Sequence, residues 1–284
     1  MKIGIVISGG DVSGINNFIF QIARLANADI TIFNGGIPGL LDKNHQEVAW
    51  RDLVDFSIAS IPIITSGRTS RRLLRSEYET IAKKIKSLRI DVLIMAGGDG
   101  SLQFLNTLSE FDINCFGVGM TIDNDVYGSD YTIGFSTACE QIIKEVSRLR
   151  NTGRALPGRV FMVEILGGYC GELTLQSAIK SNADIALIPE SQLPLETLAE
   201  RVKHKLTQQN SVVILCSEGY TREYSPGFQG AIDTMIKQLE PQIGVRIRKT
   251  IVGYGLRNGD PTCEEIYQGT IMASEVVRCI QSGM

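Results

Sequence analysis

The chain is poor in the residue types that mark several classes of protein. It has two histidines, His45 and His204, and both stand in polar stretches, so we do not expect a catalytic histidine. Its six cysteines include no Cys-x-x-Cys pair, which argues against structural zinc and against a disulfide framework. No signal peptide opens the chain, and no apolar run reaches the length of a membrane span. These absences predict a reduced, cytoplasmic protein.

Dense basic runs are also missing. The formal net charge is −3, and no stretch of lysine and arginine supplies the phosphate neutralisation that nucleic-acid binding needs. One short cluster, Arg68, Arg71, Arg72 and Arg75, is too small for a nucleic-acid surface but suits a small polyphosphate. We therefore expect small-molecule partners, with no nucleic acid and no membrane.

The 284 residues, 43% hydrophobic and 21% charged, have the balance of a folded globular protein. Short runs rich in Val and Ile alternate with longer amphipathic segments, which is typical of parallel sheets covered by helices. The runs predict strands at 3–8, 29–33, 62–65, 92–96, 115–119, 160–166, 185–188, 212–216 and 250–253. The segments predict helices at 14–26, 77–88, 137–150, 171–180, 195–208, 227–239 and 263–280. So many strands favour two doubly wound α/β lobes with mainly parallel sheets over one sheet.

Two glycine-rich turns each follow a predicted strand. They are Ser8-Gly-Gly-Asp-Val-Ser-Gly14 and Gly97-Gly-Asp-Gly-Ser101. Glycine lets the backbone approach a phosphate, and the helix N-terminus behind such a turn offers free N–H groups. In the second turn, Asp99 can also reach a magnesium ion. A tight turn without any ligand is the alternative interpretation.

A third loop carries Asp123 and Asp125 directly after the run at 115–119. Side chains two apart on an extended segment point the same way, so we expect both carboxylates to face one cavity at the carboxyl edge of the sheet. One carboxylate can take a proton from an attacking hydroxyl while the other helps to hold a cation. Three such loops at one edge favour a nucleotide or polyphosphate site.

These motifs resemble those of the bacterial-type 6-phosphofructokinases. The resemblance rests on both glycine turns, on Thr-Ile-Asp-Asn-Asp at 121–125, and on Val-Gly-Tyr-Gly-Leu-Arg-Asn-Gly-Asp-Pro at 252–261, all in family order. It implies a lobe for the phosphate donor, ATP with Mg²⁺, at residues 1–134 with 256–284, and a sugar-phosphate lobe at 135–255. It also implies a homotetramer, or at least a homodimer. The chain ends at Met284 after a predicted helix, whereas typical members continue, so we expect a divergent, C-terminally shortened member.

The resemblance also assigns roles to residues. Asp123 resembles the general base, Thr121 and Asp125 its positioning neighbours, and Asp99 the magnesium-handling aspartate. The residues that match the donor side are Gly10, Arg68, Gly100 and Ser101. Those that match the acceptor side are Arg159, Glu218, Arg248, Tyr254 and Arg257, of which Arg159 and Arg248 would reach the acceptor's 6-phosphate from a neighbouring subunit.

Several positions depart from the family pattern. Gly168 stands where an arginine is usual, Tyr254 replaces a histidine, and Phe104 replaces a glycine near the adenine, where its ring would narrow the pocket. Phe20 falls where an effector-binding arginine is expected. Gly100 and Met120 replace the Asp and Lys typical of pyrophosphate users, which favours ATP.

Three functions follow from this pattern. The first is a Mg²⁺-dependent kinase that transfers the ATP γ-phosphate to the 1-hydroxyl of fructose 6-phosphate or a closely similar sugar phosphate. The second is a kinase of the same fold that acts on another small hydroxylated acceptor, or that takes pyrophosphate as donor. The third is a non-catalytic sensor of nucleotides or sugar phosphates, against which the retained Asp99, Asp123 and Asp125 argue.

Overall fold

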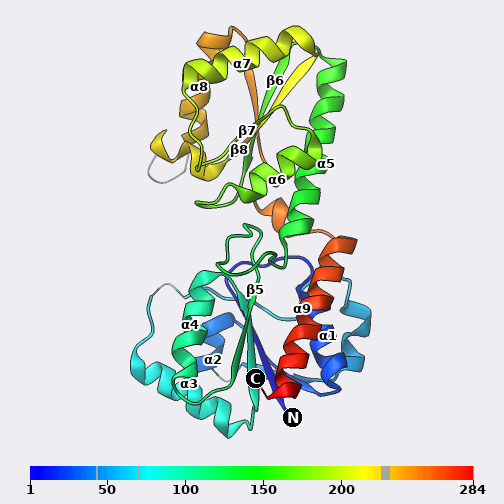
Figure 1. The fold of residues 1–284 in the computed structure, drawn as a ribbon, viewed down its shortest axis with the longest axis vertical. Helices are drawn as coiled ribbons and strands as arrows, with labels where there is room; N and C mark the ends of the chain where they lie inside the picture. Colours follow the sequence, from blue (N-terminus) through cyan, green and yellow to red (C-terminus); the bar gives the residue numbers. More distant parts are fainter. Residues whose placement is uncertain (43, 70, 225–230, 284) are drawn as a thin grey trace. The chain divides into compact units, whose positions relative to one another are not determined.

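The computed structural model describes residues 1–42, 44–69, 71–224 and 231–283 (Figure 1). The chain divides into two compact units. Unit 1 comprises Met1–Thr137 and Arg257–Met284, and unit 2 comprises Ala138–Leu256. The sequence interpretation placed its lobe boundaries at 134/135 and 255/256, and the structure divides the chain at 137/138 and 256/257.

The unit 1 sheet is parallel apart from one edge. Its strands lie in the order β3-β2-β1-β4-β5, and only β3 runs antiparallel to its neighbour among the pairs that the structure describes. The strands are β1 (Ile3–Ser8), β2 (Ile30–Phe33), β3 (His45–Val48), β4 (Val92–Gly97) and β5 (Cys115–Gly119). Every residue of β1 and β4 is buried, as expected for central strands covered on both faces.

Helices cover both faces of the unit 1 sheet. Figure 1 shows α2 (Gly36–Leu41), α3 (Arg75–Ser87) and α4 (Asp99–Ser109) on one side, and α1 (Ile15–Ala26) and α9 (Cys263–Ser282) together on the other. The first group packs on a buried cluster that includes Phe33 and Ile81. Because α9 lies against α1, the last helix of the chain completes the unit that the first strand begins.

Unit 2 repeats the parallel arrangement. Its strands β6 (Arg159–Ile165), β7 (Ile185–Leu187), β8 (Ser211–Ser217) and β9 (Ile247–Ile251) lie in the order β7-β8-β6-β9. The helices are α5 (Phe135–Ala155), which begins in unit 1, α6 (Glu172–Ser181), α7 (Leu195–Gln208) and α8 (Ala231–Ile243). One face of the sheet packs on α7 and α8 through residues such as Leu198, Met235 and Leu239.

The predicted class, doubly wound α/β with mainly parallel sheets, is confirmed by this topology. The strand predicted at 62–65 is wrong, since this segment is irregular. The strand predicted at 250–253 lies earlier, as β9, and the start of the helix predicted at 227–239 lies outside the described residues. In the part of the chain that the structure describes, no helix is long and apolar enough to cross a membrane.

Candidate active site

The first glycine turn leaves β1 at the carboxyl edge of the unit 1 sheet. Gly9 has φ +112°, a conformation that favours glycine, and its N–H donates to the Gly67 carbonyl at 3.2 Å. A methyl group on Gly10 would lie 1.9 Å from Nη1 of Arg257. The absence of a side chain at Gly10 therefore makes room for the Arg257 guanidinium, which also lies 3.8 Å from Oδ1 of Asp11.

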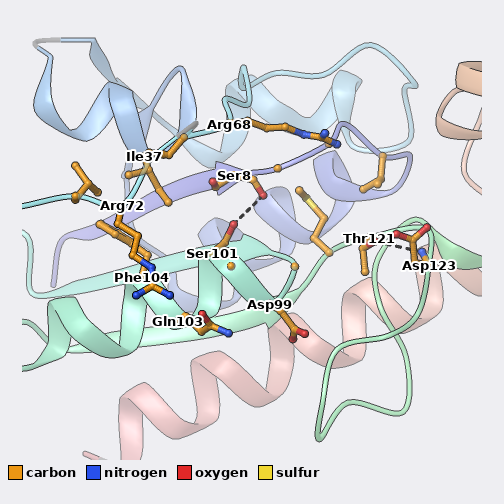
Figure 2. A pocket seen from close by; sticks show the side chains of 18 of the residues that line it. Ser8, Ile37, Arg68, Arg72, Asp99, Ser101, Gln103, Phe104, Thr121 and Asp123 are labelled. Carbon is orange, nitrogen blue, oxygen red and sulfur yellow. Dashed lines mark hydrogen bonds between the residues drawn. The ribbon is translucent and has the colours of Figure 1, made fainter. Parts of the chain in front are cut away.

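The second turn leads from β4 into α4. Ser101 Oγ lies 3.3 Å from the Ser8 carbonyl, so it joins the two turns and is buried between them (Figure 2). By contrast, a methyl group on Gly98 or on Gly100 would meet no atom of the described residues within 4 Å. Both glycines border open space at the N-terminus of an eleven-residue helix, where free N–H groups and the helix dipole favour an anion.

The third loop does not have the extended geometry that the sequence interpretation assumed. Asn124 has φ +53°, in the left-handed region, so Asp123 and Asp125 do not alternate along a strand. Asp123 lines the cavity, and its backbone N–H donates to Thr121 Oγ1 at 3.2 Å. Asp125 does not line the cavity directly but lies near Asp99, which does, so only the expected strand-like alternation of the two carboxylates is wrong.

Asp125 instead interacts with Asp99. Asp125 is an exposed residue, but the protein around its carboxyl group removes enough water to raise the pKa, and the negative charge of Asp99 raises it further. The two carboxyl groups are thus near enough to repel each other. A bound cation would remove that repulsion.

A cavity of about 900 Å³ in unit 1 connects these loops (Figure 2). Figure 2 shows Arg68 and Asp99 on opposite sides of the hydrogen bond between Ser8 and Ser101. The predicted site residues that line the cavity are Gly10, Arg68, Asp99, Gly100, Ser101, Thr121, Asp123 and Arg257. The cavity therefore gathers positive charge, backbone amides and carboxylates at the carboxyl edge of the sheet.

The other end of the cavity is aromatic. Phe104 packs on Tyr78 with ring centroids 5.1 Å apart, and Tyr78 packs on Phe111 at 6.1 Å. The Phe104 side chain is 5% exposed, so most of its ring belongs to the core while one part borders the cavity. Its neighbours on the lining include Ile37, Leu73 and Thr107.

Residues missed by sequence reasoning also line the cavity. Gln103 and Thr107 follow Asp99 at steps of four along α4, so they share one helix face. No helix was predicted after the second glycine turn. Had one been predicted, its periodicity would have placed these residues on the same face as Asp99. Arg71 was noted only as part of a cluster, and the structure pairs it with Glu77 through contacts of 2.6 and 2.8 Å. The hydrogen bond from Arg71 lowers the pKa of Glu77 to about 2.

Unit 2 carries the other predicted acceptor residues. Glu218 directly follows β8, and its Oε1 accepts from the Gly167 and Gly168 N–H groups at 3.2 and 2.9 Å. Tyr254 follows β9 and is 77% exposed. The half-buried Glu164 lies near Glu218, since burial and the Glu218 charge both raise the pKa of Glu164.

Arg159 and Arg248 lie away from Glu218 within unit 2. Arg159 opens β6 opposite Ser211, and Arg248 pairs with Phe161, so both stand near the amino ends of parallel strands. Glu218 stands beyond the opposite end, about 20 Å away for six residues of strand. Unit 2 therefore does not bring these arginines and Glu218 into one site.

A doubly wound α/β unit with glycine turns, arginines and a carboxylate at one sheet edge defines a protein of the class that binds phosphorylated small molecules. The family model described as Phosphofructokinase matches residues 2–280. The chain belongs to the phosphofructokinase family, and it is a phosphotransferase with an alcohol group as acceptor. The resemblance noted in the sequence is confirmed.

Individual relatives span nearly the whole chain. The ATP-dependent 6-phosphofructokinase of Spiroplasma citri is 33% identical over 294 residues, covering 100% of this chain and 85% of that protein. A pyrophosphate–fructose 6-phosphate 1-phosphotransferase of Thermoproteus tenax is 28% identical, covering 100% and 87%. The structure of phosphofructokinase from Saccharomyces cerevisiae superimposes with a TM-score of 0.86 at 25% identity, covering 99% of this chain and 42% of that one. Relatives named for either phosphate donor are therefore similar to this chain.

Proposed function

We propose that this protein is a Mg²⁺-dependent kinase that transfers the γ-phosphate of ATP to the 1-hydroxyl of fructose 6-phosphate or a closely similar sugar phosphate. The observation that carries the proposal is the unit 1 cavity, which is lined by Asp123, Asp99 and Arg68 together with both glycine turns. Unit 1 is then the donor lobe and unit 2 the acceptor lobe.

Asp123 acts as the general base in this proposal. It accepts the proton of the sugar hydroxyl as the oxygen attacks the γ-phosphorus in line, the bond from this phosphorus to the β–γ bridging oxygen breaks, and ADP leaves. Thr121 holds the backbone of Asp123. Arg68, Arg257 and the exposed amides near Gly98 and Gly100 stabilise the negative charge that spreads over the phosphoryl oxygens. Ser101 contributes through the geometry of the turns, because its hydroxyl bonds to Ser8.

Family membership implies a magnesium ion, and the residues at the cavity fit one. No group of three or more His, Cys, Asp or Glu side chains suited to a metal occurs among the described residues, but magnesium held by one or two carboxylates and by substrate phosphates needs no such group. Asp99 and Asp125 would hold the ion, since their carboxyl groups already interact unfavourably. When bound, the ion offsets phosphate charge.

The donor proposed is ATP. Gly100 borders open cavity, so an aspartate in its place would put a negative charge where phosphates must lie. The aromatic end formed by Phe104 and Tyr78 offers apolar surface to a nucleobase, for which pyrophosphate has no use. Met120 stands where pyrophosphate users typically carry a lysine, and its uncharged side chain is 2% exposed.

A homo-oligomer, proposed to be a homotetramer and at least a homodimer, accounts for the arginines of unit 2. Arg159 and Arg248 stand about one strand length from Glu218, so they cannot complete the acceptor site of their own unit 2. Each would instead reach the 6-phosphate held by a neighbouring copy.

A second acceptor class is favoured by one observation. Gly168 has φ +56°, and none of the described residues lies within 4 Å of a methyl group placed on it, so the position where an arginine is usual in the family holds no side chain of its own. A screen of ATP and pyrophosphate against sugar phosphates and free polyols tests both proposals. Turnover only with an unphosphorylated acceptor overturns the first proposal, and nucleotide binding without any turnover favours the sensor.

A further inference from the structure

Glu265 is a completely buried carboxylate that the proposed reaction does not use. It stands in the first turn of α9, with 0% of its surface exposed, and its N–H donates to the capping hydroxyl of Thr262 at 3.1 Å. A buried carboxylate is costly unless it is hydrogen-bonded. Its partners therefore show what it holds in place.

Those partners lie at the start of α5, far away in the sequence. Oε1 accepts from the Gly134 N–H at 2.7 Å, and Oε2 accepts from the N–H and hydroxyl of Thr137, each at 3.1 Å. The Tyr131 hydroxyl lies near this carboxylate, since burial and the charge of the carboxylate both raise the pKa of Tyr131. The first N–H groups of a helix have no partner inside it, so this carboxylate caps α5 from outside.

The segment that Glu265 holds is paired with the catalytic loop. Ile133 donates to the Gly119 carbonyl at 2.9 Å and accepts from the Thr121 N–H at 3.1 Å. Thr132 donates through its hydroxyl to the Thr121 carbonyl at 2.7 Å and through its N–H to Asn124 Oδ1 at 2.8 Å. The backbone before Asp123 and the Asn124 side chain after it are thus tied to residues 132–133, directly before Gly134.

The first glycine turn meets the same carboxylate. A methyl group on Gly14 would lie 2.5 Å from Cγ of Glu265, and one on Gly134 would lie 2.5 Å from Cβ of Val12. The turn, the start of α5 and the Glu265 side chain are packed without spare room. The end of this turn therefore fixes the position of the carboxylate and, through it, the start of α5.

We propose that Glu265 is a positioning residue that sets where Asp123 stands relative to the two glycine turns. It does so by fixing Gly134 and Thr137, to which the catalytic loop is hydrogen-bonded through residues 132 and 133. This inference rests on the proposed role of Asp123 as base. Its effect belongs to the chemical step rather than to donor binding, because Gly98, Gly100 and Arg68 make no contact with it in the bonds described.

The test compares Glu265→Gln with Thr270→Val in the full-length protein. Glutamine keeps the side-chain length but replaces one accepting oxygen with an NH₂ group, which cannot accept from a backbone N–H. Thr270→Val removes the 3.1 Å bond between Thr270 and Asn17 in the same α1–α9 interface, without touching the loop. Both variants are first shown to be folded by circular dichroism.

We expect Glu265→Gln to lower kcat by about 100-fold, the cost of a displacement of about 1 Å in a reacting group. We expect the Kd for ATP to stay within about twofold and amide hydrogen exchange in residues 119–134 to become at least about tenfold faster. Thr270→Val should leave kcat, the Kd for ATP and the hydrogen exchange of residues 119–134 unchanged. Equal kcat and equal exchange in the two variants would overturn the inference.

Hydrogen exchange separates this inference from the proposed function. If the wild-type protein phosphorylates no acceptor, the kinase proposal fails, yet faster exchange of residues 119–134 in Glu265→Gln still supports the positioning role. If Glu265→Gln does not fold, Glu265→Asp keeps the charge and withdraws it by one methylene group. The same comparisons then apply, and unchanged exchange in Glu265→Asp counts against the role.

Discussion

Three glycines, which carry a hydrogen atom in place of a side chain, shape the cavity in different ways. The hydrogen atom in place of a side chain at Gly10 makes room for a guanidinium, and the same feature at Gly98 and Gly100 leaves space open. The three glycines look alike in the sequence, but their surroundings differ. Substitutions at these positions should therefore fail in different ways.

Gly10→Ala should lower the rate. The new methyl group would displace the Arg257 guanidinium, which now lies within 1.9 Å of that position, and loss of a positioned cation costs about 10²–10³-fold in kcat. Gly98→Ala is the matched variant, because its methyl group enters open cavity and should raise the KM for ATP with stability unchanged. Steady-state kinetics of both, with thermal melts, check the expectation. An equal effect on kcat in the two would contradict it.

Asp123→Asn should remove most of the turnover while donor and acceptor binding stay nearly intact. An amide cannot accept the hydroxyl proton, and a lost general base typically costs about 10²–10⁴-fold. Initial rates and calorimetric binding provide the measurement. Asp130→Asn is the control, since this exposed aspartate belongs to the same loop but not to the cavity lining. Normal turnover by Asp123→Asn would show that the base is another group.

Elements show where sequence reasoning succeeds and where it fails. Strands β1 and β5 were predicted to the residue, because each is a short apolar run that leads into a turn or loop with glycine or aspartate. Strand β3 was missed, since His-Gln-Glu-Val carries no apolar alternation and is paired only through β2. The wrong strand at 62–65 is apolar, but no strand pairs with it.

Only part of the candidate site was predicted, namely the part that local sequence signals determine. Glycine turns and their strands are local signals, so the prediction located both turns correctly. The geometry of Asp123 and Asp125 failed because Asn124 takes φ +53°, although asparagine is one of the residues that enters this region most readily. The role inferred for Glu265 was beyond sequence reasoning, because its partners lie more than 125 residues away.

Helix α3 should show a pH-dependent contribution from its first turn. The carboxylate of Glu77 accepts from Arg71 and from the Leu74 N–H at 2.7 Å, and its pKa falls from 4.5 to about 2. A depressed pKa in the folded state gives stability that is fully present above the unfolded value and lost as the pH falls towards the folded one. The wild-type melting temperature should therefore approach that of Glu77→Gln between pH 4.5 and 2. A difference in melting temperature between the two proteins that stays constant from pH 4.5 to pH 2 would contradict this expectation.

At the scale of the whole molecule, a site shared between copies can be tested with hybrids. Arg248→Ala and Glu218→Gln should each be nearly inactive alone. If Arg248 serves the neighbour's acceptor site, a mixed dimer contains one site with neither substitution, so an equal mixture should regain about a quarter of the wild-type activity. The assay follows activity after the two variants are unfolded together and refolded. No recovery, although mixed oligomers are seen by native mass spectrometry, would show that each chain completes its own site.

The discontinuity of unit 1 also affects how the protein is made. During synthesis, residues 1–137 leave the ribosome first, and the 119 residues of unit 2 follow before α9 exists. For that interval the α1 surface that α9 will cover, including the Asn17 amide that donates to Ile266 and Thr270, has no partner. Unit 1 therefore cannot complete its helical cover until α9 has been made. A chain that stops before α9 would lack Glu265, and we expect it to be inactive.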